Sequence, residues 1–216
     1  LRATTTGEIY VMKRITTMSC LAAAVLATAL AGTPVGATPP NPSPGTAVVD
    51  GNPGEWNLAT DFFTNMYRAG NPSKPIESKA YLRYDCSTHT MYVLVLGVPG
   101  VPVYIDSNAV TAWVAIDNQS NKVVNEASGN DGIPPDFEWI GRNFDSNNQH
   151  ALGYEASFPL AEGSCNIIVH CDVDNGGAQT SASPGFPGTG PPLVVACDPV
   201  PTVTSTWSGV KKLLLP

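Results

Sequence analysis

The sequence contains few charged side chains, and basic residues are scarcer than acidic ones. Of the 216 residues, 13% are charged, with 11 Lys and Arg against 18 Asp and Glu. Without the three basic residues and the one acidic residue that precede Thr38, the remaining chain carries a net charge of about −9. Such a chain has no basic surface for nucleic acid and is repelled by anionic lipid. We therefore expect no nucleic-acid partner.

Local motifs of the common hydrolases are also missing. There is no G-x-S-x-G or H-E-x-x-H motif, and His89, His150 and His170 are scattered along the chain. A glycosidase needs only two carboxylates placed in three dimensions, but no sequence feature selects a pair. We predict that the protein is not an enzyme and that its function requires no cofactor.

Only one stretch is apolar over about ten residues, from Leu21 to Leu30. A helix that crosses a bilayer needs roughly 20 such residues, so no membrane span is expected. The stretch follows Lys13-Arg14 and precedes Val35-Gly36-Ala37, which is the pattern of a secretory signal peptide over residues 12–37. We therefore expect a secreted or cell-surface protein.

The rest of the chain divides into four further segments. Residues 1–11 read as upstream sequence before a true start at Met12, and residues 38–45 form a Pro-rich spacer that is unable to join a sheet. Residues 46–198 are expected to form one domain, followed by a tail over 199–216. The tail contains STWSGVKK, which resembles a C-terminal ending of some secreted bacterial proteins but departs from it after the lysines.

Composition and alternation within the domain predict an all-β fold. Val, Thr and Tyr are abundant between Gly- and Pro-rich turns, and no amphipathic helix of useful length is present. We predict an antiparallel β-sandwich, jelly-roll or immunoglobulin-like, of about nine strands. The expected strands are 47–51, 79–85, 91–97, 110–117, 122–126, 137–141, 152–160, 165–173 and 192–197, with long polar loops at 127–136 and 174–192.

Four cysteines follow the leader, namely Cys86, Cys165, Cys171 and Cys197. An even number in an exported protein favours two disulfides, whereas zinc would require a close Cys/His pattern that is absent. Cys165 and Cys171 flank a β-like run that places their Cα atoms roughly 20 Å apart, beyond the reach of a disulfide. Unless that run bends, Cys86 pairs with one of them and Cys197 with the other.

Tryptophans are the candidate platforms for stacking a ligand. Trp113 shares a strand face with Thr111, Ala115 and Asp117, which favours exposure, and Trp139 lies beside the 127–136 loop. Trp56 is expected to pack in the core.

Carboxylates gather in two places. Asp131 and Asp136 lie in or at the end of the 127–136 loop, and long loops on a β scaffold commonly carry binding groups. Asp172, Asp174 and Asn175 present the start of a Ca²⁺ ligand set, although no Glu follows at the position an EF-hand loop requires. A solvated acidic loop is the alternative interpretation.

Two segments resemble extracellular β-sandwiches related to family-nine carbohydrate-binding modules. DGNPGEW at 50–56 is similar to their opening D-G-x-x-x-E-W pattern, and GYEASFPL at 153–160 is similar to their Y-E-x-x-I-P-L strand. The resemblance implies a structural role for Asp50, Gly51 and Trp56, and it carries over no sugar-stacking residue.

Together these features predict an exported, non-catalytic module that binds an extracellular carbohydrate or a similar polymer. The alternative is a structural or surface-assembly protein that associates with itself through edge strands or its tail.

Overall fold

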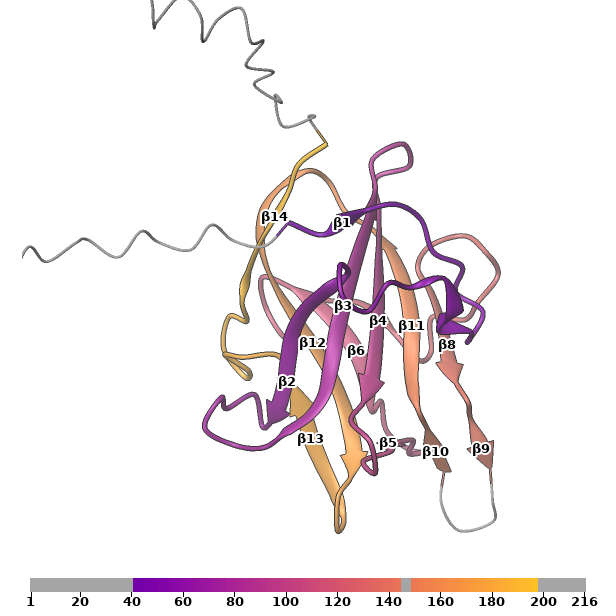
Figure 1. Cartoon of the computed structure of the whole chain (residues 1–216), viewed down its shortest axis with the longest axis vertical. Helices are drawn as coiled ribbons and strands as arrows, with labels where there is room; N and C mark the ends of the chain where they lie inside the picture. The colour runs from indigo at the N-terminus through magenta and orange to yellow at the C-terminus, as the bar shows by residue number, and fades with distance from the viewer. Residues whose placement is uncertain (1–40, 145–148, 198–216) are drawn as a thin grey trace, which may run out of the picture. The chain divides into compact units, whose positions relative to one another are not determined.

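The computed structural model describes residues 41–144 and 149–197, which form an antiparallel β-sandwich (Figure 1). Apart from one 3₁₀ turn, η1 (Pro53–Glu55), its regular elements are strands. The predicted all-β class and single domain are confirmed. In these two ranges, no helix is long and apolar enough to cross a membrane.

One sheet of the sandwich contains five long strands in a continuous hydrogen-bonded order. Its order is β8 (Asp136–Ile140), β11 (Gly153–Pro159), β4 (Thr90–Gly97), β3 (Ile76–Asp85) and β2 (Phe62–Arg68). The short β1 (Ser43–Pro44) adds to β3 in parallel.

The second sheet is centred on the long strand β12 (Gly163–Asp174). It pairs with β13 (Ala178–Ala182), β6 (Ala112–Ile116), β14 (Pro192–Val195) and β5 (Val103–Tyr104). β7 (Lys122–Asn125) continues from β6, while β10 (Gln149–Ala151) and β9 (Asn143–Phe144) continue from β5.

The two sheets are joined on one side, and on the other they are joined only at one end, where β10 pairs with β5 and leads through Leu152 into β11. β2 pairs with β13 through Arg68 with Ser181 and Tyr67 with Ala182. Opposite this seam, β7 pairs only with β6 and β8 only with β11 among the described strands, so the sandwich is open between them. In Figure 1 the seam lies on the left and β8 on the right.

Alternation along the strands explains three separate apolar clusters. Leu82, Val93 and Val114 belong to the core between the sheets. On the outer face of the first sheet, Tyr81 and Leu94 pack with Trp56 in a second cluster. The outer face of the second sheet carries a third cluster around Trp113.

The predicted hairpin of residues 79–97 is confirmed, with Tyr81 opposite Leu94 and Asp85 opposite Thr90. The expected strand at 47–51 is wrong, because that segment instead crosses the outer face of the first sheet. The prediction that the 38–45 spacer cannot join a sheet is wrong for its last residues. Ser43 and Pro44 pair with β3, and the Gly45 N–H donates to the Tyr84 carbonyl at 3.0 Å. A proline can occupy such an edge because its neighbours supply the hydrogen bonds.

The N-terminal segment is held on the sheet by the buried carboxylate of Glu155 on β11. One oxygen accepts the indole N–H of Trp56 at 2.8 Å. The other accepts the backbone N–H groups of Gly51 at 2.9 Å and Asp50 at 3.3 Å. Glu155 is 1% exposed, and burial raises the pKa of its carboxyl, although the Trp56 hydrogen bond lowers it. The segments DGNPGEW and GYEASFPL therefore meet at one carboxylate.

Gly51 permits this close contact for two reasons. Its φ of 76° lies in the left-handed region, and a Cβ there would come within 2.7 Å of the Trp139 carbonyl oxygen. Arg83 completes the attachment by lying over the Trp56 ring at 5.0 Å and donating to the Glu55 carbonyl at 2.7 Å. Trp56 is 7% exposed, as expected for a core residue.

The predicted cysteine pairing is wrong. Cys86 in the β3–β4 turn is bonded to Cys197 just after β14, with their Cα atoms 5.5 Å apart. Cys165 and Cys171 are free thiols on β12, where the extended backbone keeps them apart. Cys171 is fully buried, and its burial raises the pKa of the thiol to about 12. The expectation that Cys165 and Cys171 do not bond to each other agrees with the structure.

We expect Cys86→Ser to lower the free energy of unfolding by about 4 kcal/mol, because the disulfide closes a loop between residues 111 positions apart. Urea unfolding without reductant measures the loss, with Cys165→Ser as the control that keeps the bond. In wild-type protein beginning at Thr38, thiol counting after unfolding should find two reactive thiols. Four or none would contradict the assigned pairing.

We expect Glu155→Gln to lower the free energy of unfolding by about 3 kcal/mol. Hydrogen bonds to a buried carboxylate are strong, and both oxygens of Glu155 accept N–H groups. In either orientation, the NH₂ group of a glutamine would face one of these N–H donors. Glu55→Gln is the matched control, because exposed Glu55 accepts one N–H, from Val48, and an amide oxygen can replace it. Equal denaturation midpoints for the two variants would refute the anchoring role of Glu155.

Candidate functional site

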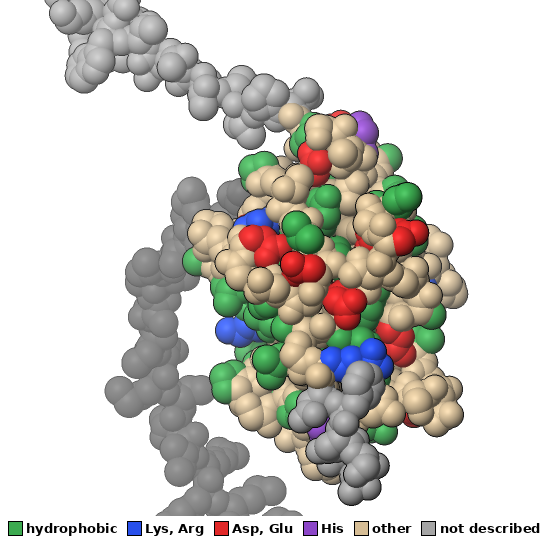
Figure 2. All heavy atoms as spheres, turned by 90° about the vertical axis from the view of Figure 1, so that its right-hand side faces the viewer, with side chains coloured by type: hydrophobic (Ala, Val, Ile, Leu, Met, Phe, Trp, Pro, Cys, Tyr) green, Lys and Arg blue, Asp and Glu red, His purple; other side chains and the backbone are tan. Residues whose placement is uncertain are grey.

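The open side of the sandwich contains a hollow of about 440 Å³, which we call the edge hollow. It lies where the end of β7, the edge of β8 and the segment after β5 approach one another. Its lining comprises Ile105, Asp106, Ser107, Glu126, Gly129, Asn130, Phe137, Glu138, Trp139, Arg142 and Gln149. Figure 2 views the side of the domain that carries β8, where acidic side chains are interspersed with hydrophobic ones.

β8 supplies the aromatic part of the edge hollow. Phe137 and Trp139 alternate with Glu138 and point into the core, where their ring centroids are 4.9 Å apart. The Tyr154 ring stacks on Phe137 at 4.9 Å. Both Phe137 and Trp139 line the edge hollow, but they are only 4% and 7% exposed, so most of their ring surface is buried in the core.

Asn130 lies on the loop that folds back along β8. The Phe137 N–H donates to the Gly129 carbonyl at 2.7 Å, which aligns the loop with the strand. The Asn130 side-chain amide donates to the Val49 carbonyl at 2.7 Å and to the Glu138 carboxylate at 3.4 Å. The N-terminal segment anchored by Glu155 thus also fixes the position of Asn130.

Glu126 borders the hollow from the end of β7. Its two carboxylate oxygens accept the backbone N–H and the hydroxyl of Thr111, both at 3.0 Å. Burial raises the pKa of Glu126, whereas the Thr111 bonds and the Arg142 charge lower it. Because its rotamer is fixed by Thr111, Glu126 presents a positioned acceptor.

The chemistry of the edge hollow suits a neutral polar ligand. Three carboxylates, those of Asp106, Glu126 and Glu138, outnumber the single guanidinium of Arg142, so an anionic ligand is repelled. The amides of Asn130 and Gln149 add donors and acceptors. A neutral, hydroxyl-rich molecule can donate to the carboxylates and exchange hydrogen bonds with the amides.

The expected exposure of Trp113 is wrong. Its strand faces are as predicted, but the ring is 5% exposed because the 183–190 loop covers it. Trp113 stacks on His170 at 4.6 Å and contacts Phe186 at 6.1 Å, while the Lys122 ammonium lies 4.7 Å from the ring centroid. No face of this indole is available to a sugar.

Trp139 borders the edge hollow as part of its wall, yet its ring is 7% exposed and belongs to the core. The prediction that Trp139 offers an open platform for stacking a ligand is therefore wrong.

Asp131 and Asp136 lie together, but they stabilise their own loop. Asp136, which is 4% exposed, accepts the backbone N–H groups of Asp131 at 3.1 Å and Gly132 at 3.2 Å. Asp131 is exposed and accepts the Ile133 N–H at 3.0 Å. Neither residue lines the edge hollow, although Asp136 borders a neighbouring one.

The structure does not bring the three predicted Ca²⁺ ligands together. Asp172 and Asp174 end a regular strand, and burial raises the pKa of Asp172. Each has different side-chain partners: Thr180 for Asp172, His150 for Asp174 and Glu77 for Asn175. Among the described residues, neither Asp172 nor Asp174 belongs to a close group of three His, Cys, Asp or Glu side chains, and Ca²⁺ needs six to eight oxygen ligands.

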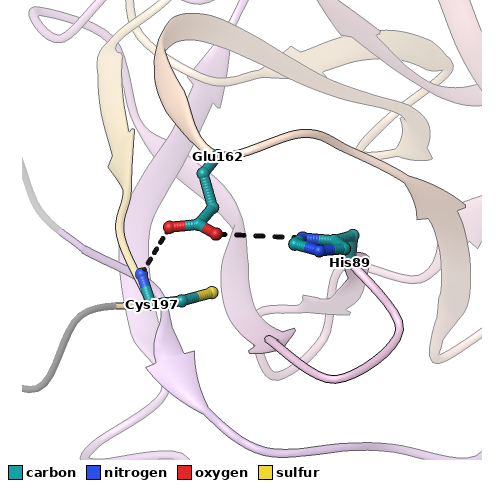
Figure 3. Close-up of side chains that lie close together, drawn as sticks. All are labelled: His89, Glu162 and Cys197. Atoms are coloured by element: carbon teal, nitrogen blue, oxygen red, sulfur yellow. Dashed lines mark hydrogen bonds and ion pairs between the residues drawn. The ribbon is translucent and has the colours of Figure 1, made fainter.

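In the described ranges, one group of three potential metal ligands lies close together, and it consists of His89, Glu162 and Cys197. Figure 3 shows the Glu162 carboxylate between the His89 ring, at 4.0 Å, and the Cys197 backbone N–H, at 2.9 Å. The Cys197 sulfur is bonded to Cys86, so no thiolate is available and two donors remain. A zinc site uses three or four protein ligands, so this group does not form one.

Sequence reasoning missed Glu126, Asn130, Arg142 and Gln149. These four come from separate segments, and no local pattern links them. The weak signal was the long 127–136 loop itself. No protein-family model and no curated protein matches this chain, so the site geometry carries the functional argument.

His170 provides a pH test of the covered Trp113 face. Burial lowers the pKa of His170 to about 4, with a further decrease from Lys122. The folded state therefore keeps His170 neutral, and this contribution to stability is present above the unfolded pKa of about 6.5 and lost as pH falls toward 4.

We expect wild type to lose about 3 kcal/mol more unfolding free energy than His170→Phe between pH 7 and pH 4, because Phe keeps the stacked ring and cannot take up a proton. Urea unfolding at several pH values measures the difference. Parallel pH profiles for the two proteins would contradict a buried, neutral His170.

Proposed function

We propose that this protein is an exported, non-catalytic module that binds a neutral extracellular carbohydrate in the edge hollow. The observation that carries the proposal is the set of carboxylate and amide groups, several of them fixed by hydrogen bonds, that line the edge hollow beside apolar residues. Carbohydrates present both hydroxyls and C–H faces, so they match both kinds of surface. The resemblance of DGNPGEW and GYEASFPL to carbohydrate-binding modules points to the same class of ligand.

The disulfide between Cys86 and Cys197 is compatible with an oxidising compartment and supports the proposed export. Catalysis is not proposed, because the carboxylates of the edge hollow are engaged by neighbours. Glu126 is bonded to Thr111, and Glu138 is bonded to the Trp139 N–H at 3.1 Å.

Self-assembly through an edge strand such as β8 or through the tail is the weaker candidate, and the tail at 199–216 lies outside the described residues. A partner strand would need the free edge of β8, but the loop already occupies it at Phe137 through the Gly129 carbonyl. Edge pairing there would also cover the hollow. The two functions are therefore exclusive at this edge, and light scattering on the protein used for binding distinguishes them.

An array of neutral and anionic polysaccharides tests the proposal with protein beginning at Thr38. We expect retention by neutral glycans, no retention by uronate-rich or sulfated ones, and no change with EDTA. Ser107→Trp fills the edge hollow from an exposed position and should lower affinity at least about tenfold, by analogy with blocking a small-molecule site.

Ser73→Trp is the matched control, since Ser73 is also exposed and lies in the turn between β2 and β3, away from the edge hollow. Retention on no neutral glycan by the folded protein would overturn the proposal. Equal retention of Ser107→Trp and Ser73→Trp would show that the ligand does not bind in the edge hollow.

A further inference from the structure

A second hollow of about 230 Å³, which we call the outer hollow, lies on the outer face of the first sheet. Three neighbouring strands form its base: Ser157 of β11 is opposite Tyr92 of β4 on one side and Asp136 of β8 on the other. Val48 of the N-terminal segment and Pro134 of the 127–136 loop form its walls.

The outer hollow also combines polar groups with apolar ones. Tyr92 supplies a ring and a hydroxyl, and burial together with the charges of Asp85 and Asp136 raises the pKa of that phenol, so it remains a donor. Asp136 keeps one oxygen for the turn, and its other oxygen has a single long contact, 3.5 Å from the Ser157 hydroxyl. Val48, which is 63% exposed, adds an apolar rim.

Asn130 connects the two hollows, because it lines both. Its side chain is fixed at that boundary by the Val49 carbonyl and the Glu138 carboxylate. A ligand that crosses Asn130 can contact the edge hollow and the outer hollow at the same time.

We infer that the edge hollow and the outer hollow form one continuous site that binds along an extended neutral polysaccharide chain, with sugar units in both. This inference rests on the proposed function and adds the class of ligand: a chain longer than a disaccharide. When one ligand occupies both hollows, its overall affinity exceeds the affinity of either contact alone. Affinity should therefore rise with the length of the oligosaccharide.

Titration calorimetry tests this with cello-, xylo-, manno- and malto-oligosaccharides of two and six units and protein beginning at Thr38. In any series that binds, the hexasaccharide should bind at least about tenfold more tightly than the disaccharide. Val48→Trp, which fills the outer hollow from an exposed position, should remove this gain. Leu58→Trp should retain it, because Leu58 is also exposed, at 47%, and lines neither hollow.

Two results would overturn the continuous site while leaving the proposed function in place. One is equal affinity for two and six units. The other is a full gain with chain length in Val48→Trp that is confirmed as folded by its thermal transition. If no oligosaccharide of the four series binds, the continuous site and the proposed function are both overturned.

Discussion

The hydrogen bonds to the buried carboxylate of Glu155 are the constraint on which the rest of this domain depends. They convert the Gly-rich turn at Asp50 and Gly51 into a cover for the first sheet and fix the indole of Trp56 beneath it. The Val49 carbonyl of that cover then positions Asn130, which lines both hollows. The buried carboxylate of Glu155 is thereby coupled, through Val49, to the position of Asn130 in the candidate site.

Coverage of the two outer faces explains where the site lies. The N-terminal segment covers the first sheet around Trp56, and the 183–190 loop covers the second around Trp113. Pairing of β2 with β13 closes one side of the sandwich. The side between β7 and β8 has no such closure among the described strands, so core aromatic residues and polar loop residues meet there in a hollow.

Particular residues show how far the sequence predicted the structure. The alternation around Trp113 correctly predicted its strand face, but burial came from Phe186, 73 positions away, which no local pattern reveals. β13 was missed because Ala178–Ala182 contains small and polar residues without branched aliphatic side chains, and it forms a strand only between β12 and β2. The site was missed because its polar members, spread over residues 126–149 and joined by residues 105–107, follow no local sequence pattern.

Indole N–H signals in a two-dimensional ¹H–¹⁵N spectrum test the central claim most directly, because the tryptophans report on different faces. Titration with a neutral oligosaccharide should shift the Trp139 signal beside the edge hollow and leave that of Trp113 unchanged. A shift of the Trp113 signal with Trp139 unmoved would place the ligand on the covered face and contradict the account.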